Sequence, residues 1–220
     1  MLDHGFVALD GALASDLAVV NGARVSFNQA SDEMGERDEG LIRFLMRERH
    51  GSPFEHGYFR FVVKAPLFVV REHHRHRAGH SYNEWSGRYS KIEAEFYVPE
   101  NVRTQVGKPG AYSFEPVSPE LAEQTREDLR AVYEQAFATY ERLVEQGVAR
   151  ELARSVIPVG AYTEFFWTIN ARSLMNFVSL RAAETAQREI RRYADACERF
   201  FAERMPVTHA AFVAANRIAP

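Results

Sequence analysis

Apolar and polar positions recur along this chain with two periods, one typical of helices and the other of strands. The spacing predicts a helix capped by Ser15 over DLAVVNGARVSF and a second helix over Asp32 to Arg47. GFVAL near the start and YFRFVVKA (58–65) have the composition of strands, and His50-Gly51-Ser52-Pro53 is typical of a turn. The apolar face of the second helix consists of Leu41, Ile42, Leu45 and Met46.

The middle of the chain changes pattern several times. Pro66 suits the first turn of a helix through LFVVREHHRHR, because its missing N–H would be unpaired there anyway. KIEAEFYV (91–98) alternates and predicts a strand with Ile92, Ala94, Phe96 and Val98 on one face. Residues 99–117 are rich in proline, glycine and polar groups, which predicts a long surface loop.

Helices dominate the second half. Ser118-Pro119-Glu120 is a strong helix start, and Gly147 a plausible end. FFWTIN (165–170) has the composition of a buried strand, and one long helix is predicted from Ala171 to Arg204, before Pro206. We therefore expect an α+β fold, a single domain over 1–220 in which helices pack on a small mixed sheet and the long helices lie in the C-terminal half.

Composition narrows the class of protein. The chain has 220 residues, 46% of them hydrophobic, enough for one large core. A net charge of −3 argues against holding duplex DNA by bulk charge. Cys197 is the one cysteine, so no intramolecular disulfide can form, and no signal peptide or membrane-length apolar run is evident. We expect a cytoplasmic protein.

A dense basic segment follows the apolar PLFVV. It contains Arg71, Arg75 and Arg77 with three histidines between them. On a helix, Arg71 and Arg75 would lie one turn apart, and two like charges about 6 Å apart repel by roughly 3 kcal/mol at an effective dielectric of about 20. Such a cluster is stable if it is solvated, paired with carboxylates or bound to an anion, and arginine favours phosphate or carboxylate because its planar fork donates two parallel hydrogen bonds.

SYNEWSGRYS comes next. Glu84, Ser86 and Arg88 alternate there, so that an extended loop would point all three the same way. A carboxylate, a hydroxyl and a guanidinium together suit the hydroxyls and phosphate of a nucleotide. The stretch from Arg75 to Ser90 is therefore the candidate site for a phosphorylated ligand.

Other interpretations of these residues are weighed against this one. A run of charges is usually a solvated helix face. The histidines 73, 74, 76 and 80 suggest metal, but adjacent histidines on a helix point apart and the arginines repel a cation, so we expect none. Cys197 is better explained as a structural thiol than as a nucleophile. Ser86 has only His80 as a possible base, which favours substrate binding over nucleophilic attack.

Two other classes of protein remain to be distinguished. A module that binds RNA would use Tyr82, Trp85 and Tyr89 to stack bases, but the acidic balance and a second polar cluster at 170–181 argue against it. A nicotinamide or flavin enzyme of the Rossmann type would need a G-x-G-x-x-G turn after a strand, and the sequence has none.

Several segments together resemble one known family. Arg75-His76-Arg77 precedes Ser86 by eight residues, with SPFEH (52–56) and PLFVVR (66–71) upstream and RELARSVIP (150–158) and FFWTINARSLMNFVSLRAAETAQREI (165–190) downstream. In these segments the chain resembles the flavin-dependent thymidylate synthases. That family has seven residues between the Arg-His-Arg triplet and the serine, so one extra residue falls in Ala78-Gly79-His80.

The resemblance implies an activity. Such enzymes convert dUMP to dTMP, taking the methylene group from methylenetetrahydrofolate and the reducing hydride from NADPH by way of FAD. They are homotetramers with active sites at subunit junctions. It implies no nucleic-acid polymer and no membrane as partner.

The resemblance also implies site residues. Arg181 matches the arginine that polarises the uracil at N3, which is the catalytic position. Glu72 stands where many members carry glutamine, His73 and His74 replace bulky aromatic residues, and Thr185 replaces a histidine. FAD-binding positions fall on Ser52, Arg75, His76, Arg77, Glu84, Asn170, Arg172 and Asn176. The dUMP-binding positions fall on Glu72, Arg75, Glu84, Ser86, Gly87, Arg88, Arg154 and Arg181.

Overall fold

A four-stranded antiparallel sheet lies at the centre of the chain. The computed structural model describes residues 1–220, and the strand order is β1 (Phe6–Leu13), β2 (Tyr58–Pro66), β6 (Tyr162–Asn170) and β3 (His80–Glu84). Side chains alternate along β2, so that Phe59, Phe61, Val63 and Ala65 are buried. The α+β class is confirmed, but every strand pairing is antiparallel, so the expected mixed sheet is wrong in that detail.

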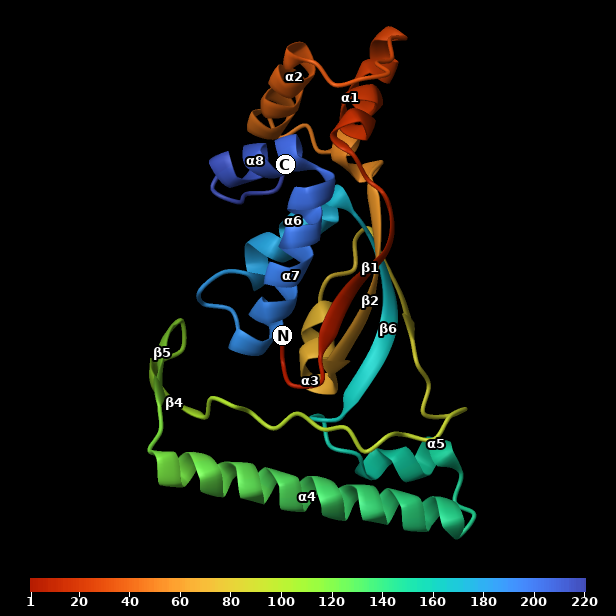
Figure 1. Cartoon of the computed structure of the whole chain (residues 1–220), viewed down its shortest axis with the longest axis vertical. Helices are drawn as coiled ribbons and strands as arrows, with labels where there is room; N and C mark the ends of the chain where they lie inside the picture. Colours follow the sequence, from red (N-terminus) through yellow and green to blue (C-terminus); the bar gives the residue numbers. More distant parts are fainter.

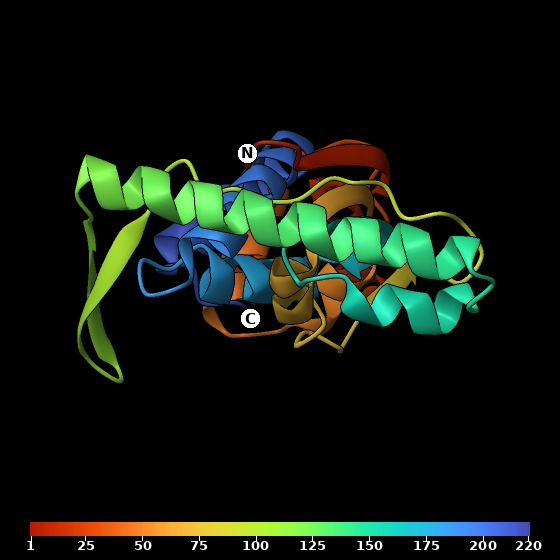
Figure 2. The same cartoon turned by 90° about the horizontal axis from the view of Figure 1, so that it is seen from below.

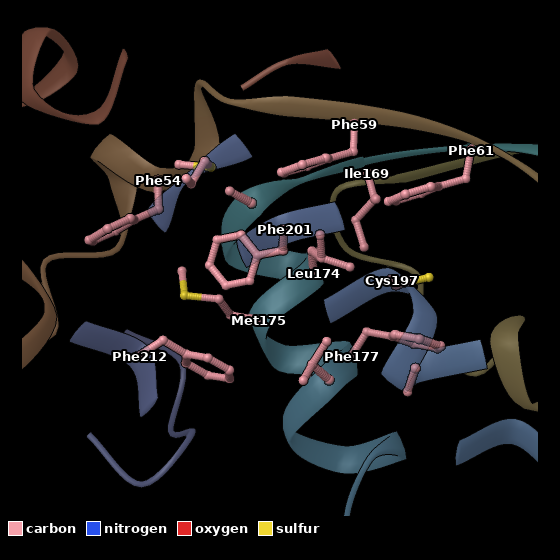
Figure 3. Packing of buried hydrophobic residues seen from close by; sticks show 14 of the residues in the cluster. Phe54, Phe59, Phe61, Ile169, Leu174, Met175, Phe177, Cys197, Phe201 and Phe212 are labelled. Atoms are coloured by element: carbon pink, nitrogen blue, oxygen red, sulfur yellow. The ribbon is translucent and has the colours of Figure 1, made fainter. Parts of the chain in front are cut away.

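Helices cover one face of this sheet (Figure 1). They are α6 (Ala171–Arg181) and α7 (Arg188–Arg204), with α3 (Leu67–His73) beside α7. Figure 3 shows Phe59 and Phe61 of β2 near Phe177 of α6 and Phe201 of α7, within a cluster of 28 buried residues. The core therefore lies between the sheet and the C-terminal helices.

The single helix predicted over Ala171 to Arg204 is wrong. The chain leaves helical geometry between α6 and α7, and a further helix, α8 (Pro206–Ala214), follows. An unbroken helix of that length would extend about 50 Å, far beyond a nine-residue strand of about 30 Å. The break lets α7 pack against α6, so that both helices bury apolar faces on the sheet. The predicted end before Pro206 is confirmed.

The N-terminal helices gather at one end of the sheet with α8 (Figure 1). They are α1 (Asp16–Arg24), the 3-10 turn η1 (Val25–Phe27), α2 (Glu36–Arg47) and the 3-10 turn η2 (Ser52–Glu55). The Ala18 N–H donates to Ser15 Oγ, which confirms the predicted cap. The second helix begins at Glu36 instead of Asp32, because Asp38 accepts the Gly35 N–H and so fixes the helix start there.

An arm lies at the end of the molecule opposite α1, α2 and α8 (Figure 1), and its long helix runs across the body when seen from below (Figure 2). It consists of α4 (Pro119–Glu145), α5 (Arg150–Ala153), the 3-10 turn η3 (Arg154–Val156) and the hairpin of β4 (Arg103–Lys108) and β5 (Ala111–Pro116). Both predicted ends of α4 are confirmed, since Leu121 N–H donates to Ser118 Oγ and Gly147 has φ 85°. Of its 27 residues only Tyr140 is buried.

Two predictions next to this arm are wrong. Residues 103–116, within the predicted loop 99–117, form the hairpin, because Pro109-Gly110 turns the chain, with Gly110 at φ 86°, and lets Lys108 pair with Ala111. Residues 91–98 are extended but make one isolated bridge, from Phe96 to Ala161, instead of a strand. Phe96 stacks on Tyr133 of α4 and so joins the arm to the sheet. None of the helices combines the length and the apolar character that crossing a bilayer requires.

Candidate functional site

The basic segment leaves the helix earlier than its spacing predicts. Helix α3 ends at His73, and the Arg75 and His76 N–H groups donate to Glu72 and His73 carbonyls in a tight turn. The helix expected to carry both Arg71 and Arg75 therefore ends before Arg75. The turn points the His76 ring inward, where it is 7% exposed, while Arg75 and Arg77 lie in solvent.

Arg181, the last residue of α6, reaches this turn and is held there through all three nitrogens of its guanidinium. Its Nε donates to His76 Nε2 at 2.9 Å, its Nη1 forms an ion pair with Glu72 Oε2 at 2.5 Å, and its Nη2 contacts the Glu72 carbonyl at 3.3 Å. The side chains of Arg181 and Glu72 are 21% and 24% exposed, so a ligand can still reach them. The structure thus joins three sequence-predicted site residues in one cluster.

Two histidines of the segment are held neutral. Burial, together with the charge of Arg181, lowers the pKa of His76 to about 4, so its Nε2 is free to accept the Arg181 N–H at neutral pH. Burial also lowers the pKa of His80 to about 4. The Nδ1 of His80 accepts from Trp167 Nε1 at 3.0 Å, and Tyr82 Oη lies 3.1 Å from it. No hydrogen bond joins His80 to Ser86, so the structure does not assemble the base that a serine nucleophile would need.

His73 is buried in the core without a hydrogen-bond partner. Neither ring nitrogen has an acceptor or donor, and the ring packs against Trp167 and Phe177 at centroid distances of 5.1 and 4.9 Å. Burial lowers the pKa of His73 well below its usual value, so the ring stays neutral. It fills the place of an aromatic side chain.

Replacement of His73 by phenylalanine should therefore remove part of the acid sensitivity of the fold. Burial depresses the pKa of His73 in the folded protein, so as pH falls the unfolded chain takes up the proton first. The free energy of unfolding therefore decreases as pH falls below about 6.5, the usual pKa of histidine. Between pH 7 and 5.5 the parent should lose about 1 kcal/mol more free energy of unfolding than the variant. Urea unfolding at both pH values measures this, with the exposed His74→Phe as control. Equal losses of free energy of unfolding in the parent and in His73→Phe would show that His73 is not held neutral in the folded protein.

The extra residue next to the triplet is accommodated by a glycine turn. Gly79 has φ 72°, and a Cβ there would lie 2.4 Å from Asn170 Nδ2. The Asn170 N–H donates to the Gly79 carbonyl at 3.3 Å, and Ser173 Oγ donates to Ala78 O at 2.8 Å. Asn170 also caps α6 through Ser173 N–H. The turn is thus fastened to the start of the helix that carries Arg181.

Glu84 to Arg88 form a second group at the end of β3. Glu84 Oε1 accepts from Thr163 Oγ1 at 2.8 Å and lines a cavity of about 530 Å³. Gly87 is buried, and a Cβ on it would lie 3.7 Å from Arg154 Cδ, so the structure brings Gly87 and Arg154 together. Arg88 lies over the Tyr89 ring at 4.9 Å. The expected alternation of Glu84, Ser86 and Arg88 in an extended loop is wrong beyond Trp85, since the Tyr89 N–H donates to Ser86 O in a turn.

A third group lies near the C-terminus. Arg172 Nε donates to Pro220 O at 2.7 Å, and Nη1 pairs with Glu55 at 2.5 Å. Gly51 packs so closely on Arg172 that a Cβ would meet Nε at 2.4 Å, which places Ser52 beside it. Asn176 is exposed on α6 and makes no hydrogen bond.

These three groups are not joined by any hydrogen bond or salt bridge within the chain. The structure also leaves several of the predicted cations without a carboxylate partner within salt-bridge distance: Arg71, Arg75, Arg77, Arg88 and Arg154. No group of three or more His, Cys, Asp or Glu side chains is arranged to hold a metal ion.

Sequence reasoning missed Thr163 and Ser173, which hold Glu84 and the glycine turn. Ser173 falls within the matched NARS segment, whereas Thr163 gives no signal.

Cys197 is fully buried and its thiol pKa is raised by that burial. It lies in the core, where Figure 3 shows it near Phe177 of α6. The prediction of a structural thiol is confirmed.

Comparison with known proteins identifies the family of the chain. The family model described as thymidylate synthase complementing protein matches residues 9–207. The chain is 46% identical to the flavin-dependent thymidylate synthase of Streptomyces coelicolor, covering 97% of this chain and 93% of that protein. For the enzyme of the same name from Thermotoga neapolitana the identity is 47%, with the same coverage.

Solved structures give the same result. The UMP/dUMP methylase PolB from Streptomyces cacaoi, bound with 5-Br UMP, is 45% identical, with a TM-score of 0.90 over 98% of this chain and 96% of that one. Bound with 5-Br dUMP, it gives 46% identity, a TM-score of 0.91 and coverage of 98% and 97%. Fold, matched residues and identity over nearly the full length agree, and this chain belongs to the flavin-dependent thymidylate synthase family.

Proposed function

We propose that this enzyme methylates dUMP reductively to dTMP in the cytoplasm, with residues 1–220 acting as one domain. In this proposal methylenetetrahydrofolate supplies the carbon and NADPH supplies the hydride through FAD. The observation that carries it is the position of Arg181, which Glu72 and His76 hold on a partly exposed surface beside unpaired arginines. Relatives named thymidylate synthases at 46–47% identity support the same reaction.

The free cations support a phosphorylated substrate. Arg88 lies in the turn after Gly87, and Arg154 lies beside that glycine, with no carboxylate to neutralise either guanidinium. Two such groups can donate paired hydrogen bonds to the phosphate of dUMP. We propose that they bind this phosphate, with Ser86 and Arg75 also in contact with the nucleotide and Glu84 between nucleotide and flavin.

The donor set also fits FAD. Arg75 and Arg77 are exposed and unpaired, as a diphosphate requires, and Asn176 offers an exposed amide for the polar edge of a flavin ring. The turn at Gly79, fastened to Asn170, would hold this side of the site in place. We propose that these residues bind FAD together with Ser52, His76, Glu84 and Arg172. When bound, the flavin supplies the hydride chemistry, which no side chain of the protein can provide.

Arg181 has an electrostatic role in this proposal. Two N–H groups of its guanidinium remain free and can donate to the uracil ring as negative charge develops there. No cysteine nucleophile is needed, in keeping with the burial of Cys197.

Assembly as a homotetramer, with sites at subunit junctions, belongs to the same proposal. No hydrogen bond or salt bridge joins the three groups of site residues within one chain, and α4 buries only Tyr140. The outer face of the sheet exposes Tyr58 and Phe166, at 43% and 48%. Surfaces of this kind are typical of subunit contacts.

The purified protein should be yellow and should oxidise NADPH only when dUMP is present. Absorbance near the flavin bands and steady-state NADPH consumption with methylenetetrahydrofolate measure this. UMP is the second candidate substrate, since the similar PolB is described as a UMP/dUMP methylase. We expect dUMP to be used with the higher kcat/KM. A protein that takes up no flavin would refute the proposal, and equal or better use of UMP would move the assignment to the ribonucleotide.

A further inference from the structure

Helix α6 alone does not fix the direction of the Arg181 side chain. Arg181 is the last residue of α6, and the chain leaves helical geometry directly after it. A free arginine side chain has many rotamers, and the entropy of fixing one of them would otherwise oppose the reaction step. Something outside the helix must therefore orient the guanidinium.

The contacts that orient it come from the end of α3. Glu72 accepts from Nη1 with its carboxylate and from Nη2 with its own carbonyl, and His76 accepts from Nε. All three guanidinium nitrogens are thus held by residues 72–76. Three of the five N–H groups are used and two remain, one on Nη1 and one on Nη2.

We infer that Glu72 is a positioning residue that acts on the reaction through Arg181 and does not bind the substrate itself. This deepens the proposed function and rests on it. Glu72 stands where the family commonly has glutamine, which can keep one acceptor oxygen toward Nη1 but not the charge. The carboxylate is already paired with Arg181 at 2.5 Å, so it has an acceptor role within the protein that needs no ligand.

A chain of contacts behind His76 stiffens this arrangement. Tyr82 Oη donates to the His73 carbonyl at 2.9 Å, and the His80 ring stacks on Trp167 at 5.7 Å. Phe177, one turn before Arg181 on α6, packs edge-on against the His76 ring at 5.0 Å. His76 therefore rests on a buried aromatic residue of the helix that carries Arg181, and Glu72 holds the guanidinium with its charged side chain.

Substitutions of Glu72 and Arg181, singly and together, test this in the flavin-loaded enzyme. Glu72→Ala should lower kcat for dUMP about 10-fold or more and change KM less than about threefold, because the ground-state contacts to dUMP remain. In an Arg181→Ala background the same substitution should change turnover less than about twofold, because its route of action is gone. The exposed pair Glu39–Arg43 on α2 is the matched control, with Glu39→Ala and Arg43→Ala expected to leave kcat unchanged.

Three results would overturn the inference. An increase in KM with kcat unchanged would show that Glu72 binds dUMP directly. If Glu72→Ala lowers turnover or dUMP affinity as much in the Arg181→Ala background as in the parent, Glu72 acts independently of Arg181. The dUMP affinity is measured from the change in the flavin spectrum. Glu72→Gln keeps an acceptor oxygen and should restore most of the kcat lost in Glu72→Ala. This variant also tests the inference if Glu72→Ala folds poorly. A kcat of Glu72→Gln more than tenfold below that of the parent would show that Glu72 supplies charge and does not orient Arg181. If the parent itself shows no dUMP-dependent NADPH oxidation, the proposed function fails instead.

Discussion

Arg181→Ala should lower kcat/KM for dUMP about 100- to 1000-fold while the protein still folds and binds flavin. The guanidinium is held through all three of its nitrogens and still has two free N–H groups. A donor fixed where charge develops contributes about 3 to 4 kcal/mol to a transition state, because it does not have to reorganise during the reaction. Steady-state NADPH oxidation measures the loss.

The fold should tolerate this change. Truncation leaves the Glu72 carboxylate without its partner, but at 24% exposure that carboxylate can bind water, so we expect a cost of about 1 to 2 kcal/mol in the free energy of unfolding. Arg43→Ala, which breaks an exposed pair with Glu39, is the control. A variant with near-normal turnover would remove Arg181 from the reaction, and one that loses flavin and structure together would leave its role to be tested with Arg181→Lys.

The parts of the fold that depend on local chemistry were predictable. Ser15 and Ser118 cap their helices as the sequence indicates, and the alternation in YFRFVVKA places Phe59 and Phe61 on the buried face of β2. These features are set by residues close in sequence, where hydrogen-bonding rules and periodicity suffice.

The errors occur where distant contacts decide the structure. Helical periodicity runs through Ala171 to Arg204, but packing on a short sheet breaks it after Arg181. Helix α3 ends at His73 because the chain must turn at Gly79 and enter β3 beside β6. Neither requirement is visible in a local window, since strand pairing is settled by residues far away along the chain.

The candidate site was identified by its motifs, but its internal connections were not. The segments around Arg75 to Arg88 and Asn170 to Arg181 are specific enough to imply a family and a set of positions. The pairing of Glu72 with Arg181 joins residues 109 apart, and no spacing rule predicts it. The resemblance places Glu72 among the dUMP-binding positions, whereas the structure shows its carboxylate with a partner inside the protein.

Asp16→Ala should cause the largest loss of stability among single substitutions outside the core. Asp16 is 6% exposed at the start of α1, and its carboxylate accepts from the Val207 and Thr208 N–H groups at 3.0 and 2.8 Å and from Thr208 Oγ1 at 2.6 Å. These are the first N–H groups of α8, which have no partner within their own helix. The carboxylate also lies at the positive end of the helix dipole.

We expect Asp16→Ala to lower the free energy of unfolding by about 3 kcal/mol, since it removes three charge-assisted bonds and leaves two N–H groups unpaired. For a chain of this length that corresponds to a Tm about 6 to 12 °C lower. Asp10→Ala is the matched control, because Asp10 is exposed and its pair with Arg60 lies on the surface, where such pairs contribute less than about 1 kcal/mol. Asp16→Asn keeps one acceptor oxygen and should fall between the two. Equal stability of Asp16→Ala and Asp10→Ala would mean that α8 is held to α1 by apolar packing alone, and that its N-terminus needs no cap from another helix.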